Sequence, residues 1–452
     1  MNSIPNIFKA YDIRGLVDSE ITPDFTFATG LAFARYLQQV REPGTVVIGQ
    51  DMRPSSPALA DAFSAGVTSQ GMDVIRIGLA STDMLYFASG KLGLPGAMFT
   101  ASHNPAEYNG IKLCLSSARP IGKESGLAII ENFVRLGSPL EIRSVGVESN
   151  REMLEEYVDY LLSLVDLTSM RRLKIVVDAG NGMAGHTAPA IFNRLNCELI
   201  PLYFELDGSF PNHEANPIDS ANLVDLQKAV VKHKADLGLA FDGDADRCFL
   251  VDEKGMVVNP SDVTSLIAHR ELVKHPGSTI IYNLISSRAV LETIEENGGV
   301  GLRSRVGHSY IKKMMADSGA IFGGEHSGHF YFNDFWRADS GALAALHAIE
   351  ALGLNKNSMS EILKPYQRYL LSGEINSKVD DADATMDLIE NTFTGKSGVS
   401  IDHLDGLSVI GDTWWFNVRP SNTESLLRLN VEAKTQAALA ALRDEVLALI
   451  RG

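Results

Sequence analysis

The chain contains the stretch Asp236-Leu237-Gly238-Leu239-Ala240-Phe241-Asp242-Gly243-Asp244-Ala245-Asp246-Arg247. Its first half is an apolar run that predicts a buried strand, and its second half is a loop with three aspartates at alternate positions. In an extended loop such side chains point the same way, so the three carboxylates can converge on one cation. Oxygen-only ligation selects Mg²⁺ or Ca²⁺. The stretch therefore predicts a strand whose carboxyl end carries a divalent-metal site.

An EF-hand loop is one alternative, because it also begins with alternating aspartates, and Glu253 falls at its twelfth position. The sixth position of such a loop must be glycine for the turn, and here it is Arg247. The flanking segments 237–241 and 248–251 also look like strands rather than helices. A solvated acidic turn is the other alternative, but charged groups between two apolar strands are costly without a ligand. We therefore favour the metal site.

Outward from this stretch, short β-branched runs alternate with amphipathic helical stretches. This alternation starts near residue 45 and begins again near residues 173 and 279, which predicts three similar α/β units with mainly parallel strands. The expected strands are 45–49, 73–77, 96–99, 173–178, 236–241 and 279–282, and the expected helical stretches include 63–69, 309–316 and 341–351. The fold class is therefore α/β, with three similar mixed-sheet domains.

The C-terminal part of the chain differs, because it predicts antiparallel strands over 401–409, 414–418 and 426–431 and an amphipathic helix over 435–451. This is a separate α+β domain, and the polar stretch 372–383 is its expected entrance. The four predicted domains are 1–145, 146–250, 251–368 and 369–452.

Composition limits the function of the chain. It has 452 residues and a formal net charge of −16, which argues against binding nucleic acid or an anionic membrane surface. Three cysteines without a pairing pattern indicate reduced thiols in a cytoplasmic protein. We expect neither a signal peptide nor a transmembrane segment.

Ser102 lies in the tight polar turn Thr100-Ala101-Ser102-His103-Asn104-Pro105 and is a possible nucleophile. No G-x-S-x-G elbow surrounds it, as a hydrolase serine would require. A serine that carries a phosphoryl group needs a cation beside it, which the aspartate loop would provide. The adjacent His103 is poorly placed as the serine's base but can orient the loop or contact phosphate. Lys112 can reach back as a cation or as a proton shuttle.

Two further loops carry polar groups between apolar stretches. The loop 323–329 contains Glu325 and Ser327, which can hold two sugar hydroxyls, and its glycines permit close approach. The loop 419–425 combines one cation, Arg419, with several small donors, which suits a phosphate dianion. For both loops the alternative is an ordinary turn-rich hairpin without a binding role.

With these motifs in place, the chain resembles the α-D-phosphohexomutase family, specifically its phosphomannomutase/phosphoglucomutase branch. The resemblance covers the whole length and rests on five motifs in the family's order, at 8–15, 100–105, 242–247, 324–329 and 419–424. It implies four domains around a central cleft, a phosphorylated serine, bound Mg²⁺, a phosphosugar substrate and a bisphosphorylated sugar intermediate.

Carried over by position, the resemblance implies the following roles. The metal ligands are Ser102, Asp242, Asp244 and Asp246; the catalytic group is Ser102, Lys112, Arg14, His103, Arg247 and His308; the substrate-binding group is Tyr11, Glu325, Ser327, His329, Arg419, Ser421, Asn422 and Thr423. Two departures stand out. Ile285 occupies a position where some relatives have a lysine near the sugar phosphate, and Ser425 stands where many have proline.

The expected activity is reversible phosphoryl transfer between O1 and O6 of glucose and mannose phosphates, through a phosphoserine enzyme. Glucose 1,6-bisphosphate is the expected intermediate and activator. The alternatives are a Mg²⁺-dependent sugar phosphatase that uses the same serine, and a non-catalytic phosphosugar-binding protein.

Overall fold

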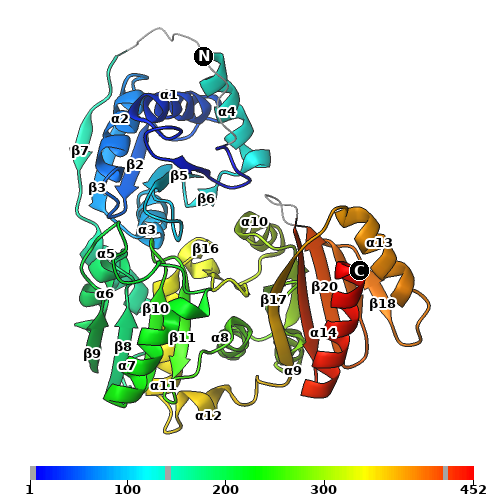
Figure 1. The fold of residues 1–452 in the computed structure, drawn as a ribbon. Coiled ribbons are helices and arrows are strands. Elements are labelled where there is room, and N and C mark those ends of the chain that lie inside the picture. Colours follow the sequence, from blue (N-terminus) through cyan, green and yellow to red (C-terminus); the bar gives the residue numbers. More distant parts are fainter. Residues whose placement is uncertain (1–6, 138–143, 421–425) are drawn as a thin grey trace.

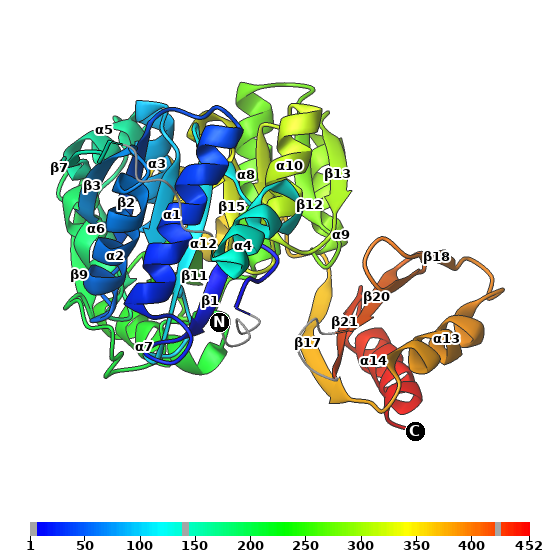
Figure 2. The ribbon, with the colours of Figure 1, turned by 90° about the horizontal axis from the view of Figure 1, so that it is seen from above.

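The computed structural model describes residues 7–137, 144–420 and 426–452, with the side chains of residues 308 and 309 outside the description. The described elements form four sheets with helices packed against them (Figure 1). The first three sheets lie together, and the C-terminal sheet stands at one side (Figures 1 and 2). The predicted fold class, three α/β units followed by an α+β domain, is confirmed.

The first sheet has seven strands in the order β1-β5-β4-β2-β3-β7, with β6 paired to β5. Its strands are β1 (Ile13–Leu16), β2 (Thr45–Gln50), β3 (Asp73–Leu79), β4 (Gly96–Phe99), β5 (Tyr108–Leu115), β6 (Arg119–Pro120) and β7 (Glu148–Asn150). Its helices are α1 (Pro23–Gln39), α2 (Ser56–Thr68), α3 (Thr82–Leu92), the 3₁₀ turn η1 (Lys123–Ser125) and α4 (Leu127–Leu136). The hydroxyl of Ser81 caps α3 by accepting from Met84 N.

The second sheet has the order β11-β10-β8-β9. It consists of β8 (Leu173–Asp178), β9 (Cys197–Leu202), β10 (Leu237–Phe241) and β11 (Cys248–Asp252). The accompanying helices are α5 (Leu154–Ser163), α6 (Ala184–Phe192), η2 (Ser220–Leu223) and α7 (Val224–His233). Residues 242–247, which carry the three aspartates, form the loop between β10 and β11.

The third sheet has the order β13-β12-β14-β15-β16. It consists of β12 (Thr279–Asn283), β13 (Val300–Ser304), β14 (Phe322–Gly324), β15 (Phe330–Phe332) and β16 (Ala338–Asp339). The accompanying helices are α8 (Pro260–Lys274), α9 (Arg288–Glu296), α10 (His308–Ser318), η3 (Asn333–Phe335), α11 (Gly341–Gly353) and α12 (Met359–Leu363).

The three units share one topology. In each, the first strand lies between the second and third in parallel, and a fourth strand pairs antiparallel with the third, giving β3-β2-β4-β5, β9-β8-β10-β11 and β13-β12-β14-β15. The loop between third and fourth strands therefore leaves the same position of each sheet. The similarity predicted from the alternating pattern is thus a similarity of strand order.

The C-terminal sheet is antiparallel, in the order β17-β21-β20-β19-β18. Its strands are β17 (Leu370–Lys378), β18 (Ser400–Asp402), β19 (Leu407–Ile410), β20 (Trp414–Pro420) and β21 (Leu426–Ala433), and its helices are α13 (Ala382–Phe393) and α14 (Gln436–Arg451). One expectation was wrong. The segment 401–409 is not one strand, because a turn at 403–406 divides it. The stretch 372–383, the expected entrance of this domain, holds most of its first strand, β17, whose polar residues lie on a partly exposed sheet face.

Apolar side chains of all three α/β units meet in one continuous core, which includes Leu85 of α3, Leu161 of α5, Phe241 of β10 and Leu346 of α11. A buried polar contact reinforces this junction. Asp83 of α3 accepts hydrogen bonds from Tyr157 OH at 2.7 Å and Ser340 Oγ at 2.6 Å. The relative position of the three units is therefore set by both apolar packing and hydrogen bonding.

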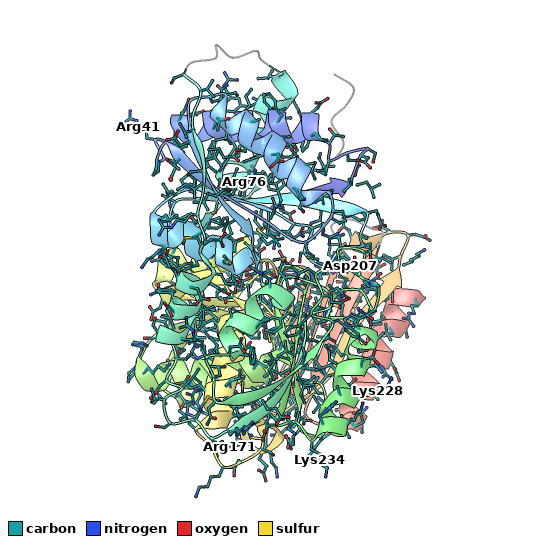
Figure 3. All side chains as sticks on the ribbon, turned by 90° about the vertical axis from the view of Figure 1, so that its left-hand side faces the viewer. Arg41, Arg76, Arg171, Asp207, Lys228 and Lys234 are labelled. Carbon is teal, nitrogen blue, oxygen red and sulfur yellow. The ribbon has the colours of Figure 1, made fainter. Side chains whose placement is uncertain are left out.

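The surface carries most of the charge. Arg41, Lys228 and Lys234 are exposed and extend away from the ribbon (Figure 3). None of the described helices combines the length and apolar character that a bilayer-crossing segment needs. Arg53, Arg247 and Lys312, by contrast, are buried.

Candidate active site

Three of the predicted loops occupy the equivalent position in the three α/β units. The serine loop joins β4 to β5, the aspartate loop joins β10 to β11, and the loop 325–329 joins β14 to β15. Carboxyl ends of parallel strands are the usual place for ligand sites in open α/β sheets. The common topology places one loop at the carboxyl end of each sheet, and the packing of the three units brings these loops together.

Ser102 is buried and has a positive φ of 51°, in the left-handed region that few non-glycine residues adopt. Its Oγ donates to Asp242 Oδ2 at 2.8 Å and accepts from an Arg247 guanidinium nitrogen at 3.0 Å. His103 Nδ1 lies 3.2 Å from the same Oγ, closer than we expected for a neighbour in sequence. The serine hydroxyl thus lies between a carboxylate and a guanidinium.

Arg53 holds the main chain of the serine loop. Its buried guanidinium donates to four carbonyl oxygens at 2.7–3.0 Å, those of Ser102, Asn104 and Pro105 in the loop and of Tyr108 at the start of β5. Asp51 compensates its charge, because Oδ2 of Asp51 accepts from Arg53 Nε at 3.2 Å. Sequence reasoning missed both residues. Their signal is a charged pair directly after strand β2, at the carboxyl end of a parallel sheet.

The three aspartates converge as predicted. Asp242, Asp244 and Asp246 are buried, and one carboxylate oxygen of each lies within 4.8 Å of the others. Lys112 Nζ contacts Asp244 Oδ2 at 2.7 Å and Asp246 Oδ2 at 2.6 Å. Thr82 at the start of α3, which sequence reasoning also missed, donates its hydroxyl to Asp244 Oδ2 at 2.5 Å. The second unit's carboxylates are therefore held by side chains of the first unit.

These residues fit a hard divalent cation. Oδ1 of Asp244 is buried and has no hydrogen-bond partner among the described residues, and Oδ1 of Asp246 is buried with His329 Nε2 at 3.5 Å. Unpartnered buried carboxylate oxygens are costly, and a cation at the centre of the three carboxylates would satisfy them. Asp246 also belongs to a second group of possible ligands, with His329 and Asp339. Lys312 contacts Asp339 at 2.5 Å, so the Asp339 carboxylate already has a counter-ion.

The charges of the cluster shift the pKa values of its members. Burial raises the pKa of Asp242 to about 7, although Arg247 opposes the shift. Burial alone would raise the pKa of Asp246 too, but Lys112, His329 and Arg247 together lower it well below its usual range. The nearby Arg247 charge and burial lower the pKa of His103, so His103 is neutral at pH 7.

Lys112 is protonated in this arrangement. Burial would lower the pKa of its ammonium group, but Asp244, Asp246 and Asp339 outweigh burial and raise the pKa above its ordinary value. A protonated amine can donate a proton and cannot accept one. The two roles expected for Lys112 are a cation and a proton shuttle. The protonated amine fits the role of a cation, and in a proton shuttle it can act only as the donor.

The loop 325–329, the third of these loops, contacts the aspartate loop directly. Cys248 N donates to Gly328 O at 3.2 Å, and Arg247 and His329 form an isolated antiparallel bridge. Gly328 has a φ of +82°, and a Cβ there would meet the Phe249 ring, so glycine is required for this approach.

Glu325 and Ser327 lie within this loop. Glu325 accepts from Gly307 N at 3.0 Å and from Tyr331 OH at 2.7 Å, and Ser327 Oγ lies 2.9 Å from His329 Nδ1. Hydrogen bonds to both oxygens fix the position of the Glu325 carboxylate. Sequence reasoning missed Tyr331, which lies on β15 two residues after His329.

The N-terminal segment reaches two loops. Arg14 donates to the Asn104 side-chain oxygen at 2.5 Å and pairs with Asp12. The Tyr11 ring lies edge-on to Tyr310, with centroids 6.2 Å apart, and its hydroxyl lies close to Gly307. Arg14 therefore contacts the serine loop, while Tyr11 extends to the third unit.

The C-terminal domain brings Arg419 to the third loop. Arg419 lies on β20 and pairs with Glu374 at 2.8 Å. Its charge and that of Arg428 act on the pKa of the neighbouring His326. Burial and the charges of these two arginines lower the pKa of His326 to about 3. The predicted residues Ser421, Asn422 and Thr423, the departure Ser425 and the His308 side chain lie outside the described residues.

Ile285 is buried in an apolar cluster with Leu284 and Trp415, between the third unit and the C-terminal domain. It therefore contributes to the packing of these two domains. An isoleucine at this position cannot supply a charge to a phosphate.

Comparison with known proteins adds to this geometry. Residues 5–138, 155–255, 259–369 and 374–449 match four successive family domains, described as phosphoglucomutase/phosphomannomutase alpha/beta/alpha domains I, II and III and the C-terminal domain. The chain is 40% identical over 448 residues to a Xanthomonas campestris pv. campestris (strain B100) protein named "Phosphohexose mutases", with 98% of this chain and 99% of that protein covered.

Two further relatives agree. The chain is 38% identical over 449 residues to a phosphomannomutase of Salmonella typhimurium (strain LT2), with 97% of each covered. A crystal structure of a phosphoglucomutase/phosphomannomutase family protein from Burkholderia thailandensis superposes with a TM-score of 0.90 at 31% identity, covering 98% of this chain and 97% of that one.

Proposed function

Because the chain belongs to the phosphoglucomutase/phosphomannomutase family and is a phosphohexomutase of the isomerase class, we propose that it moves a phosphoryl group between O1 and O6 of a hexose. Ser102 would carry the phosphoryl group, and a hexose 1,6-bisphosphate would be the intermediate. Glucose and mannose phosphates are the proposed substrates.

One observation carries the proposal. Ser102 Oγ lies 2.8 Å from Asp242 Oδ2 and 3.0 Å from the Arg247 guanidinium, at the meeting point of two domains. A phosphoryl group on this oxygen would be adjacent to the three-carboxylate cluster and to a buried cation. This is the environment that phosphoryl transfer needs, since positioning and charge stabilisation provide most of its catalysis.

In the first half-reaction, the phosphoryl group would leave Ser102 Oγ for the free hydroxyl of the bound monophosphate. Arg247 would stabilise the negative charge that develops on Oγ, because its guanidinium already donates to that atom. The attacking hydroxyl must lose its proton. Because Lys112 is protonated, it can donate a proton to the leaving oxygen but cannot accept one from the attacking hydroxyl. We therefore assign removal of that proton to His308.

The proposed cofactor is Mg²⁺, held by Asp242, Asp244, Asp246 and the phosphorylated Ser102. The buried Oδ1 of Asp244, which lacks a hydrogen-bond partner among the described residues, supports this assignment. When bound, the ion would neutralise the serine phosphate and stabilise the charge of the transition state. Metal removal by EDTA should abolish turnover reversibly.

The bisphosphate must bind in two orientations, so that either phosphate can face Ser102. We propose that Glu325 and Ser327 bind O3 and O4 of the sugar, which roughly exchange places when the sugar turns over. Tyr11 and His329 would line the same site, with Arg14 and His103 around the serine. Arg419, with Ser421, Asn422 and Thr423, would bind the phosphate that is not being transferred.

This scheme predicts dual substrate use, because glucose and mannose differ only at C2 and the proposed contacts lie at O3 and O4. Discrimination would then come from steric differences of about 1–3 kcal/mol. We expect kcat/KM for glucose 1-phosphate and mannose 1-phosphate to agree within about two orders of magnitude. A preference beyond about ten-thousandfold would require a group that binds C2.

Incubation with glucose 1-phosphate and a trace of glucose 1,6-bisphosphate tests the activity. Glucose 6-phosphate supports the mutase, whereas free phosphate would indicate the phosphatase and no product would indicate a binding protein. Intact-mass measurement would show whether Ser102 carries a phosphoryl group. We also propose a cytoplasmic location, which the free thiols of Cys114, Cys197 and Cys248 support.

A further inference from the structure

The loop between β9 and η2 connects the second unit to the first. Its residues 203–217, called the strap below, include none of the site residues described above. Asp207 of the strap lies where the ribbons of the first and second units adjoin (Figure 3). Gly208 is buried, and a Cβ there would lie 2.7 Å from Arg53 Cα. The strap therefore packs against the main chain of the arginine that holds the serine loop.

Phe210 of the strap covers one face of the Arg53 guanidinium. The ring centroid lies 5.1 Å from Arg53 Cζ, within the range of a cation–π contact. All five N–H donors of the guanidinium already have acceptors, which are Asp51 Oδ2 and the four carbonyl oxygens of the serine loop and β5. Only the planar faces of the group remain for a further contact. An aromatic ring over one face stabilises the charge, most strongly where the cation is removed from water.

The strap is anchored in the second unit by Asn181, three residues after β8. Asn181 is buried and has a positive φ of 59°. Its main-chain and side-chain groups form four hydrogen bonds of 2.8–3.0 Å with the strap, at Tyr203 O, Glu205 O, Asp207 N and Asn212 Nδ2. His213 adds a contact to Asp178, with Nε2 at 3.1 Å from Oδ2. The second unit thus holds the strap on both sides of Phe210.

The turn that contains Asn181 also contacts the aspartate loop. Met183 N donates to Gly243 O at 2.9 Å, and Gly243 lies between the first two aspartates of that loop. One continuous set of contacts therefore leads from the aspartate loop through Asn181 to the strap. It continues from Phe210 to Arg53, and from Arg53 to the carbonyl oxygen of Ser102.

We propose that the strap fixes the serine loop relative to the aspartate loop, and that Phe210 is a positioning residue that acts on Ser102 through Arg53. This inference rests on the proposed function and deepens it, because phosphoryl transfer depends on how the reacting oxygen is placed. A displacement of about 1 Å can cost about a hundredfold in rate. Loss of the ring should therefore lower kcat. KM for glucose 1-phosphate should change little, since the proposed sugar and phosphate contacts lie in the third unit and the C-terminal domain.

The first test compares Phe210→Leu with Phe133→Leu. Phe133 of α4 faces Arg35 of α1 at 5.0 Å, so this control loses the same kind of contact elsewhere in the first unit. Hydrogen exchange measured by mass spectrometry would follow the serine loop, and steady-state assays would give kcat and KM. We expect Phe210→Leu to speed exchange of the Ser102 amide by about tenfold or more and to lower kcat by about tenfold or more. Phe133→Leu should change neither quantity.

Phe210→Tyr keeps an aromatic ring over the guanidinium and should behave as the wild type in both measurements. Equal impairment of Phe210→Tyr and Phe210→Leu would overturn the proposal, because the ring would then not be the group that acts. Exchange and kcat at wild-type values in a folded Phe210→Leu protein would overturn it as well.

The Arg53→Met background tests the route of the effect. If Phe210 acts through Arg53, adding Phe210→Leu to Arg53→Met should not speed exchange of the serine-loop amides further, since the effects of residues in contact are not additive. A further increase of the size seen in Phe210→Leu alone would give Phe210 an independent structural role and overturn the proposal. Exchange is measured without substrate, so it decides on the strap separately from the activity. A wild type that makes no glucose 6-phosphate would refute the proposed function alone.

Discussion

Replacing Arg53 with methionine should release the serine loop. The guanidinium is completely buried, contacts Asp51 and donates to three carbonyl oxygens of the loop and to that of Tyr108 at the start of β5. Removing one partner of a buried ion pair costs about 3–5 kcal/mol, because the other charge is left uncompensated. Each carbonyl left without a donor adds to that cost. We therefore expect at least about 3 kcal/mol of local destabilisation.

Hydrogen exchange measured by mass spectrometry can report this loss locally. Within the loop, the amide of Ser102 donates to Thr100 Oγ1 and the amide of Asn104 donates to Ala101 O. A loss of about 3 kcal/mol should speed exchange of these amides by about a hundredfold. Turnover of glucose 1-phosphate should fall with it. Arg135→Met, on the exposed face of α4, is the matched control and should change neither quantity.

The double variant Arg53→Met, Asp51→Asn divides the effect into its two causes. Removing the uncompensated carboxylate should restore part of the melting temperature. The loop carbonyls would still lack their donors, so exchange should stay fast and turnover low. Protected loop amides together with wild-type turnover in Arg53→Met would refute the argument that the guanidinium positions Ser102.

Three further predictions follow from the site. Ser102→Ala should abolish steady-state mutase turnover with an unchanged melting temperature, and substantial activity free of wild-type enzyme would exclude Ser102 as the phosphoryl carrier. Thr82→Val should weaken activation by Mg²⁺ less than Asp244→Asn does, because it removes a hydrogen bond to the carboxylate rather than a ligand oxygen. Equal activation constants for Mg²⁺ in Thr82→Val and the wild type would show that Thr82 has no role in the metal site. Burial raises the pKa of Asp83 to about 6 in the folded protein, so its contribution to stability is present at low pH and is lost as pH rises toward and through 6. The wild type should therefore gain about 1 kcal/mol relative to Asp83→Asn between pH 7 and pH 5, and a pH-independent difference in unfolding free energy would contradict the raised pKa.

Local patterns in the sequence were sufficient for the fold class and for the chemistry of the loops. Alternating apolar runs predicted the three α/β units, and the alternating aspartates predicted converging carboxylates, because both depend on short-range periodicity. The expected single strand 401–409 failed for the same reason. Its apolar pattern continues across a turn at 403–406 that only the pairing of β18 with β19 reveals.

Contacts between distant segments depend on the tertiary structure alone. Thr82 reaches Asp244 across 162 positions, and Lys112 reaches Asp246 across 134, because the first and second units pack through a shared core. Likewise, Arg428 opposes Arg419 only through the register of two strands. Sequence periodicity determined which side of each element is buried and which residues its loops carry. The packing of whole units, a sum of many weak contacts without a local signature, decided which of those residues meet.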